Sequence, residues 1–208
     1  MKLEARLLLK DELKESFRLR HRVYCLEKKW ISPSPSGYEI DKYDKIASDY
    51  LGLWQGNRLV GTQRLIVRPN QFMVDANNEY DDIGSTYKND FSLNCAEISR
   101  LAIDKQFRNL IHPIFPNESI GYAPLELIRL VYRTCIKRGV RFLYTGTTVE
   151  IMNFFRTLIP FQQVSDLRRM SDGSVIEVAK LDFRKMEQHI ENRNSSLMHY
   201  FHSLTTSR

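Results

Sequence analysis

The sequence has little of the material that builds membrane spans or secretion signals. No run of apolar residues approaches the roughly 18 that a transmembrane helix needs. The first residues, 1–17, read MKLEARLLLKDELKESF and alternate charged with apolar positions, where a signal peptide has a long apolar core. The sequence therefore predicts a protein that has no membrane span and stays in the cytoplasm.

Cysteine is scarce as well. The three cysteines, Cys25, Cys95 and Cys135, are odd in number, far apart and in no metal-ligand spacing, so we predict no metal site. Each lies in an apolar segment, as a small buried hydrophobe does. One alternative stays open for Cys25, because His21 lies one helical turn before it and could act as the base of a thiol nucleophile.

Internal repeats and low-complexity linkers are also missing, so the 208 residues predict one domain with a sizeable core. We expect this domain to occupy residues 1–185. Residues 186–208 are polar and are expected to form a tail or a frayed helix.

Acidic residues are too few to balance the basic ones, and the formal net charge is +6. Lys and Arg are spread along the chain and interleaved with Asp and Glu. Such a mild positive field fits an acidic protein partner as well as nucleic acid, so charge alone does not choose between them.

Hydrophobic spacing predicts an alternation of strands and helices. Strands are expected at 3–9, 94–104, 140–147 and 174–183, with a hairpin at 49–69 that turns at 55–57. Helices are expected at 10–29, 124–139 and 149–159, and loops at 30–48 and 70–90, the second carrying a short helix. This order predicts a twisted mixed sheet covered by helices, an α/β or α+β domain.

Charged residues interrupt the predicted strands where apolar ones would be expected. In NCAEISRLAID, residues 94–104, strand alternation places Glu97 and Arg100 on opposite faces. Burying either charge without a partner would be costly. A β-bulge could bring both to one side, and an ion pair at an exposed sheet edge is the alternative. Arg64 lies among aliphatic residues of the hairpin and raises the same question.

Carboxylates gather in the loop EIDKYDK, residues 39–45, which holds Glu39, Asp41 and Asp44. Close carboxylates repel one another and so attract a cation, an arginine or water. The spacing lacks the glycine and oxygen ligands of a calcium loop, and a solvated acidic loop is the plain alternative. A balanced set of charges from four separate elements can then be written: Arg20, Arg64 and Arg100 against Asp41, Asp44 and Glu97.

Four fragments, in this order and spacing, resemble the autoinducer-synthase-like acyltransferases. They are FRLRHRVYCLEKKW (17–30), EIDKYD (39–44), GTQRL (61–65) and EISRLAI (97–103). That superfamily includes acyl-homoserine lactone synthases, long-chain N-acyl amino acid synthases and an exosortase-associated acyltransferase group. The likeness spans roughly residues 15–185 and implies a GNAT-like N-acyltransferase fold, a central twisted mixed sheet flanked by helices.

Two departures from lactone synthases bear on the subfamily. Tyr24 replaces their typical phenylalanine, and Lys29 replaces the glycine that usually precedes their tryptophan, here Trp30. The run RVYC, residues 22–25, looks more like the other two branches. The resemblance therefore favours transfer of a fatty acyl chain from acyl carrier protein to the amino group of an amino acid. A lactone synthase that uses S-adenosylmethionine is the alternative, and a nucleic-acid binder, which leaves the carboxylates unexplained, ranks last.

The resemblance implies an acidic acyl carrier protein as partner, with its acyl-phosphopantetheine as donor and no permanently bound cofactor. After the central strand, residues 104–126 lack the glycine-rich turn with which an acetyl-CoA enzyme holds pyrophosphate on a helix N-terminus. A carrier-bound arm has no pyrophosphate to hold. The net positive charge would then steer the donor to the site.

The family's near-invariant charged and aromatic positions carry over to single residues of this sequence. They fall on Arg20, Trp30, Asp41, Asp44, Arg64, Glu97 and Arg100. Glu97 and Arg100 are the expected catalytic residues, with Glu97 taking the proton from the acceptor's ammonium. Asp41 and Asp44 would hold that ammonium or orient the arginines. Arg20 and Arg100 would fix the geometry or bind an acceptor carboxylate.

The rest of the expected site surrounds the thioester and the acyl chain. Backbone N–H groups of residues 100–102 are expected to stabilise the oxyanion, where the central strand can splay. The resemblance places Thr145 near the acyl chain, and residues 140–155 would line an apolar tunnel, although such residues are more often plain core. The remaining expected contacts are Tyr24, Ser99, Leu101, Ala102 and Phe142. Within residues 17–30, Arg20 is expected to point inward and Trp30 to close the site.

Overall fold

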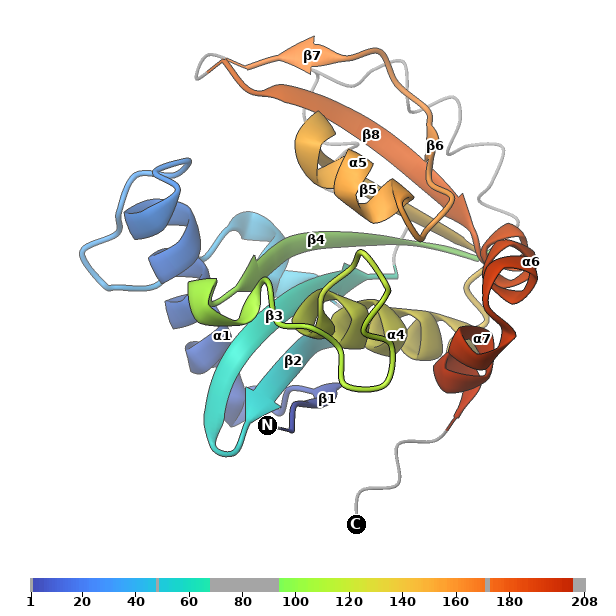
Figure 1. Cartoon of the computed structure of the whole chain (residues 1–208). Helices are drawn as coiled ribbons and strands as arrows, with labels where there is room; N and C mark the ends of the chain where they lie inside the picture. Colours follow the sequence, from blue (N-terminus) through green and yellow to red (C-terminus); the bar gives the residue numbers. More distant parts are fainter. Residues whose placement is uncertain (1, 48, 68–93, 171–172, 204–208) are drawn as a thin grey trace.

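In the part of the chain that the structure describes, a mixed β-sheet has eight strands, in the order β1-β2-β3-β4-β5-β8-β6, and β7 pairs with β8. The structure is a computed structural model that describes residues 2–47, 49–67, 94–170 and 173–203. Helices cover the sheet on both faces (Figure 1). This is the mixed α/β architecture that the sequence predicts.

The first half of the sheet is an antiparallel meander. It consists of β1 (Glu4–Leu7), β2 (Asp49–Gln55), β3 (Arg58–Ile66) and β4 (Cys95–Ile103), each paired with the next. The β2–β3 hairpin turns at Gly56, whose φ of 55° is a left-handed conformation that glycine adopts without strain. The predicted hairpin is confirmed, with its turn in the predicted place.

The second half of the sheet begins with a short parallel pair. Within the described residues, β5 (Phe142–Thr148) pairs with β4 at three positions, from Cys95–Phe142 to Glu97–Tyr144, and the strands then separate. β5 continues instead along β8 (Val175–Asp182). The two halves of the sheet therefore fan apart from the end at which β4 and β5 are paired (Figure 1).

The short strands and turns complete the chain between these elements. The strands β6 (Gln162–Gln163) and β7 (Arg168–Arg169) pair with β8. Single 3-10 turns lie at Lys10–Glu12, at η3 (Lys42–Lys45) and at Lys105–Phe107. A strand of two residues is too short to show an alternating apolar pattern in the sequence.

The first helical stretch covers the face of β3 and β4 that carries the charged residues. It consists of α1 (Leu13–Arg20), which continues directly as the π-helix η2 (His21–Glu27). The helix expected at residues 10–29 is confirmed in extent. Its second half is wound more loosely than an α-helix, a feature often found at functional sites.

The opposite face of the sheet is covered by later helices. α4 (Tyr122–Lys137) packs on β1, β2 and β3, and α5 (Val149–Arg156) packs on β5 and β8. α4 is apolar along the face turned to the sheet and ends before Gly139, at φ 69°.

The C-terminal residues, predicted as a polar tail or a frayed helix, are two helices that pack on the domain. They form α6 (Phe183–Arg193) and α7 (Ser195–His202), which pack on each other beside β8 and α4. Their buried apolar side chains belong to the main core and include Met186, Ile190, Leu197, Met198 and Phe201. The apolar residues are few, but within each helix some lie four positions apart and so share one face, as Met186 and Ile190 do in α6 and Leu197 and Phe201 in α7.

Residues 70–90, predicted as a loop with a short helix, lie outside the described residues. Within residues 2–47, 49–67, 94–170 and 173–203, the helices are all too short or too polar to cross a membrane.

Candidate active site

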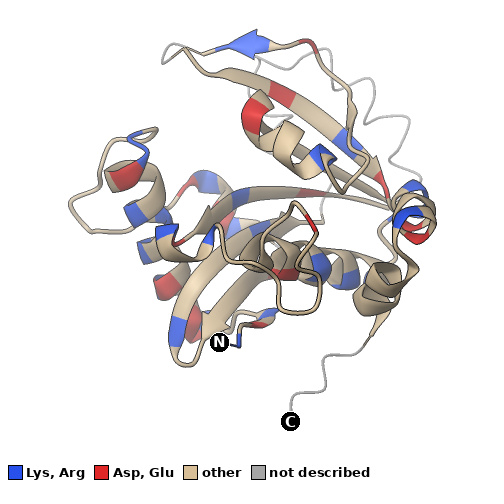
Figure 2. Cartoon of the chain, in the orientation of Figure 1, with Lys and Arg blue, Asp and Glu red and all other residues tan. Residues whose placement is uncertain are grey.

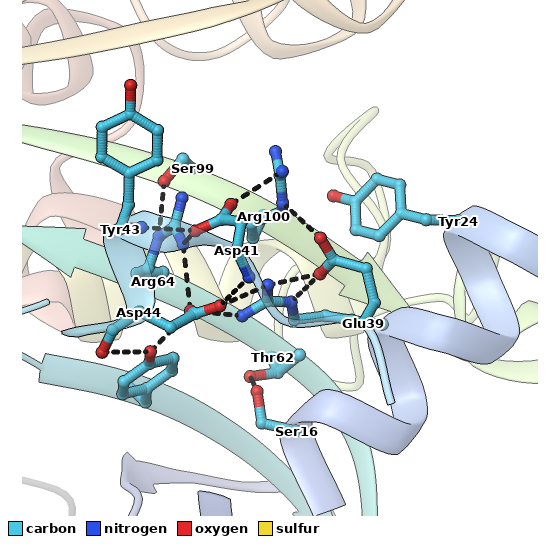
Figure 3. Close-up of polar contacts among 12 residues, drawn as sticks. Ser16, Tyr24, Glu39, Asp41, Tyr43, Asp44, Thr62, Arg64, Ser99 and Arg100 are labelled. Atoms are coloured by element: carbon cyan, nitrogen blue, oxygen red, sulfur yellow. Dashed lines mark hydrogen bonds and ion pairs between the residues drawn. The ribbon is translucent and has the colours of Figure 1, made fainter. Parts of the chain in front are cut away.

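Three arginines and three carboxylates meet on the α1 side of the sheet (Figure 3). The arginines come from three different elements: Arg20 ends α1, Arg64 lies on β3 and Arg100 on β4. The carboxylates all come from one loop: Glu39, Asp41 and Asp44. The charges balance, three against three, so the cluster is neutral as a whole.

Arg20 is, with Arg64, one of the two fully buried arginines of this network. Its side chain is 1% exposed. Nη1 and Nη2 donate to the two carboxylate oxygens of Asp44 at 2.7 and 3.0 Å, and Nε donates to Glu39. This fork-to-carboxylate geometry suits a buried charge, because it satisfies several donors at once. The inward position predicted for Arg20 is confirmed.

Arg64 and Arg100 complete the network from the sheet. Arg64 Nη1 donates to Asp41 Oδ1 at 2.6 Å and to Asp44 Oδ1 at 3.0 Å. Arg100 Nε donates to Glu39 Oε1 at 3.1 Å, and its Nη2 pairs with Asp41 Oδ2 at 2.7 Å. Each carboxylate therefore joins two arginines from different elements, and the loop is held against the sheet at three points.

The loop itself is built to present these oxygens. Asp41 caps η3 by accepting from the backbone N–H of Tyr43 at 2.8 Å. Asp44 accepts from the backbone N–H of Asp41 at 2.7 Å and from the Tyr50 hydroxyl at 2.6 Å. This reciprocal capping orients both carboxylates independently of the arginines. Of the cation, arginine or water that the clustered carboxylates were expected to attract, the structure shows arginines.

Electrostatics follow from this geometry. Burial alone would raise the pKa of Asp44, but the hydrogen bonds and charge of Arg20 outweigh burial and hold that pKa well below its usual range. Burial alone would lower the pKa of Arg20, but the carboxylates of Asp44 and Glu39 outweigh burial and raise that pKa. Both groups stay charged at neutral pH.

A β-bulge on β4 turns neighbouring side chains toward the network. The register between β3 and β4 shifts between Thr62 and Arg64, and Arg100 has a φ of 56°. Ser99 accepts a hydrogen bond from Arg64 Nε at 3.1 Å, while the next residue, Arg100, reaches the loop carboxylates. The bulge considered from the sequence is therefore present.

The π-helix places two aromatic side chains next to this bulge. The Tyr24 hydroxyl donates to the backbone carbonyl of Leu101 at 2.6 Å, and its ring lies 5.7 Å from that of Trp30. Burial raises the pKa of Tyr24 to about 12, so the hydroxyl keeps its proton. Between η2 and Trp30, Lys29 has a φ of 56°, at the position where the resemblance expects glycine.

A cavity of about 460 Å³ passes through the gap between β4 and β5. This volume is in the range of about 300–1,000 Å³ typical of small-molecule sites. Its mouth is lined by Tyr24, Trp30 and Arg100. Beyond the gap, α4 and α6 supply an apolar wall that includes Leu127 and Met186. The cavity thus joins a polar mouth to an apolar interior.

The sequence-predicted site residues fall into three groups. Six line the cavity: Tyr24, Trp30, Ser99, Arg100, Leu101 and Thr145. Four form the ion-pair network behind it: Arg20, Asp41, Asp44 and Arg64. The other three are buried, and the described residues that line the cavity do not include them: Glu97, Ala102 and Phe142.

These three buried residues lie close to the cavity without lining it. Glu97 is fully buried at the last paired position of β4 and β5, where the strands begin to separate. Ala102 packs in the small cluster under α1. Phe142 lies 4.0 Å from Lys180 Nζ on the α1 side of the sheet. Its neighbour Leu143 points to the other side and lines the cavity, because successive strand residues alternate.

Two residues outside the predicted site have roles that the structure clarifies. Glu39 is 5% exposed and bridges Arg20 and Arg100, although only its place beside Asp41 and Asp44 in the sequence pointed to it. Cys25, weighed as a nucleophile, is buried, and burial raises its pKa. A reactive thiolate needs the opposite shift, so the geometry does not favour that alternative.

Comparison with known proteins gives a family and a fold. A family model described as "N-acyl amino acid synthase FeeM" matches residues 15–175. The isovaleryl-homoserine lactone synthase of Bradyrhizobium diazoefficiens is 41% identical over 59 residues. That match covers 28% of this chain and 27% of the relative, so the similar stretch is a minor part of both.

Solved structures resemble the whole fold at low sequence identity. The CoA-dependent acyl-homoserine lactone synthase BjaI, solved with SAM and isopentyl-CoA, has a TM-score of 0.69 at 20% identity, over 91% of this chain and 89% of BjaI. FeeM, an N-acyl amino acid synthase from uncultured soil microbes, has a TM-score of 0.65 at 16% identity, over 90% and 94%. The acyl-homoserine lactone synthase LasI has 0.67 at 19%, over 87% and 90%. The fold is therefore that of the GNAT-like autoinducer synthases.

Proposed function

Since this chain belongs to the N-acyl amino acid synthase FeeM family, a family of acyltransferases, we propose that it moves a fatty acyl chain from acyl carrier protein to the amino group of an amino acid. The observation that carries the proposal is the cavity between β4 and β5. It offers an apolar interior to a chain, and at its mouth Arg100 and two aromatic rings to a polar acceptor.

The bond changes at this site are those of aminolysis. The acceptor's neutral amine attacks the thioester carbonyl carbon, the new C–N bond forms, and the C–S bond breaks to release the phosphopantetheine thiol. The bulge at Arg100 frees backbone from the β3–β4 ladder beside the gap, where N–H groups can face the developing oxyanion. Tyr24 holds the adjacent carbonyl of Leu101 and so orients this stretch.

Glu97 is the proposed acceptor of the ammonium proton. It lies two residues before Ser99, with its side chain on the same face of β4, and Ser99 lines the cavity. Glu97→Gln keeps the shape and removes the basicity, so we expect a folded protein whose kcat falls by about 10²–10⁴-fold. Glu177→Gln, at another buried glutamate that pairs with Arg156, is the matched control. A near-normal rate for Glu97→Gln would exclude it as the base.

The donor proposal is supported by the start of α4. Pyrophosphate needs free N–H groups at such a helix end. Here the N–H of Tyr122 donates to the Leu110 carbonyl at 2.6 Å. A Cβ at Gly121 would lie only 2.9 Å from the carbonyl oxygen of Arg108. The chain's own carbonyls thus lie against the first N–H of this helix, which supports a donor without a pyrophosphate.

Charge supports the same donor. Figure 2 shows basic residues on β7 and along the helical stretch of α1, on both sides of the separating strands. Lys28 and Lys29 are exposed beside Trp30 at the mouth, and Arg169 is exposed on β7. A protein with a net charge of +6 attracts an acidic carrier protein over a range of about 10 Å at moderate salt.

The second candidate is acyl-homoserine lactone synthesis from S-adenosylmethionine. Two observations favour it, the 41% identical stretch in a lactone synthase and the fold of BjaI. The two reactions differ in their products, because a lactone synthase also releases methylthioadenosine.

Mass spectrometry separates the candidates. Purified protein is supplied with palmitoyl carrier protein or palmitoyl-CoA, and with either a mixture of amino acids or S-adenosylmethionine. We expect N-palmitoyl amino acids from the carrier-protein donor. Acyl-homoserine lactone with methylthioadenosine would establish the second candidate, and equal rates from both donors would overturn the proposed donor. The absence of any acylated product would refute acyl transfer to either acceptor.

A further inference from the structure

Tyr132 lies where the apolar part of the cavity ends. The α4 side of the cavity runs from Pro124 to Tyr132, and at Tyr132 it meets Phe183 and Met186 of α6. The strands β4 and β5 are paired at this end, so the gap between them is closed here. The ring of Tyr132 packs edge-on against Phe183, with ring centroids 5.7 Å apart.

The hydroxyl of Tyr132 points away from the apolar interior. It donates to Glu187 Oε1 at 2.7 Å and lies 3.4 Å from His202 Nδ1. Glu187 is half-buried on α6 and His202 is exposed on α7, whereas Tyr132 is 2% exposed. The side chain therefore spans the layer between the cavity and the outer surface of the C-terminal helices.

A leucine at this position would fill a core without needing a polar partner. Tyrosine in an apolar wall requires one, because a buried hydroxyl without a hydrogen bond is costly. α6 and α7 supply that partner and also pack Phe201 against the ring, at a centroid distance of 5.7 Å. Tyr132 is thus held rigidly from behind by α6 and α7.

We propose that the side chain of Tyr132 closes the inner end of the acyl pocket and so sets the longest acyl chain that the enzyme accepts. The proposal rests on the proposed function, in that the cavity is taken as the acyl site. Tyr132 acts as a specificity-determining residue. Shortening it opens the pocket toward the space between α6 and α7, and longer chains then fit.

Binding of saturated fatty acids tests this without any transfer step. Wild type, Tyr132→Leu and Tyr132→Phe are titrated with the even-numbered series from octanoate to stearate, and affinity is measured by calorimetry. In wild type, affinity rises with length and then stops rising. We expect Tyr132→Leu to bind the first acid beyond that limit roughly tenfold more tightly than wild type, the discrimination that a methylene or more gives in an apolar pocket. Tyr132→Phe keeps the ring and keeps the limit.

Two further variants make the result specific. Tyr122→Leu truncates a buried tyrosine of the same helix whose hydroxyl accepts from Leu3 N–H outside the cavity, and the limit should not move. Phe155→Leu widens the wall on α5, and again the limit should stay. An unchanged limit in Tyr132→Leu, a shift in Phe155→Leu instead, or no binding of any fatty acid by wild type overturns the proposal. Fatty acid binding without acylated product would refute the proposed function alone.

Discussion

At the scale of single residues, stability should depend on the buried ion pairs far more than on the exposed ones. Asp44→Asn removes one charge and leaves Arg20 and Arg64 facing too few carboxylates. Removing one partner of a buried pair costs about 3–5 kcal/mol, and we expect a loss of this size in chemical denaturation. Glu15→Gln breaks the exposed pair with Arg18 and should cost far less, because solvent screens exposed charges. Equal losses in the two variants would contradict this prediction.

The same carboxylate sets the response to acid. The pKa of Asp44 is lower in the folded protein than in the unfolded chain, so its ionised form favours the fold. This contribution is complete above the unfolded pKa, near about pH 4, and is lost progressively as pH falls below it. We therefore expect the stability difference between wild type and Asp44→Asn to be constant near neutrality and to shrink below about pH 4. A constant difference down to the acid limit would show that Asp44 is not responsible.

Lys29 holds a left-handed backbone with a φ of 56°. A residue with a Cβ pays about 1–2 kcal/mol there, and glycine does not, although glycine gains freedom in the unfolded chain. Lys29→Gly should therefore raise the free energy of unfolding by up to about 1 kcal/mol. Lys28→Gly is the matched control, because Lys28 has an ordinary φ of −85° and gains nothing from glycine. A stabilising Lys28→Gly would point to charge rather than to backbone strain.

At the scale of elements, the π-helix and the β4 bulge act together. Tyr24 on η2 donates to the Leu101 carbonyl beside the bulge. Tyr24→Phe removes this bond and should cost about 1 kcal/mol of stability and lower kcat by up to about tenfold, because the carbonyl is no longer held. Tyr38→Phe deletes a hydroxyl on the loop between η2 and η3 and should leave kcat unchanged. The two kcat values, measured with the same donor, check the prediction.

Regular elements were predictable from the sequence because their apolar periods are plain. The β2–β3 hairpin, β4 and α4 were predicted within a few residues. The π-helix was not, since its apolar spacing over one turn and a half differs too little from that of an α-helix. The packing of the C-terminal helices, predicted as a tail or a frayed helix, was missed for another reason. Their low apolar content hid the few buried residues of each helix, such as Met186 and Phe201.

The candidate site was predictable in its charges and less so in its pairings. A charge within a strand must find a partner, which identified Arg64 and Arg100. The identity of each partner depends on how the loop of Glu39 folds over the sheet, and local periodicity carries no information on that. Whether Phe142 or Leu143 lines the cavity depends on strand register, because a shift of one residue turns each side chain to the other face of the sheet.

At the scale of the whole molecule, the net positive charge should strengthen binding of the acyl carrier protein, the protein part of the donor. Lys28 is exposed at the mouth, with Nζ 5.7 Å from the Trp30 ring. Lys28→Glu should raise KM for acyl carrier protein several-fold at low salt, and the effect should fade at high salt as charges are screened. KM for the uncharged acyl-pantetheine should not change. Lys137→Glu alters the net charge equally at the far end of α4 and should matter less. Equal effects of Lys28→Glu on both donors would mean that Lys28 acts on the arm or the acceptor and not on carrier docking.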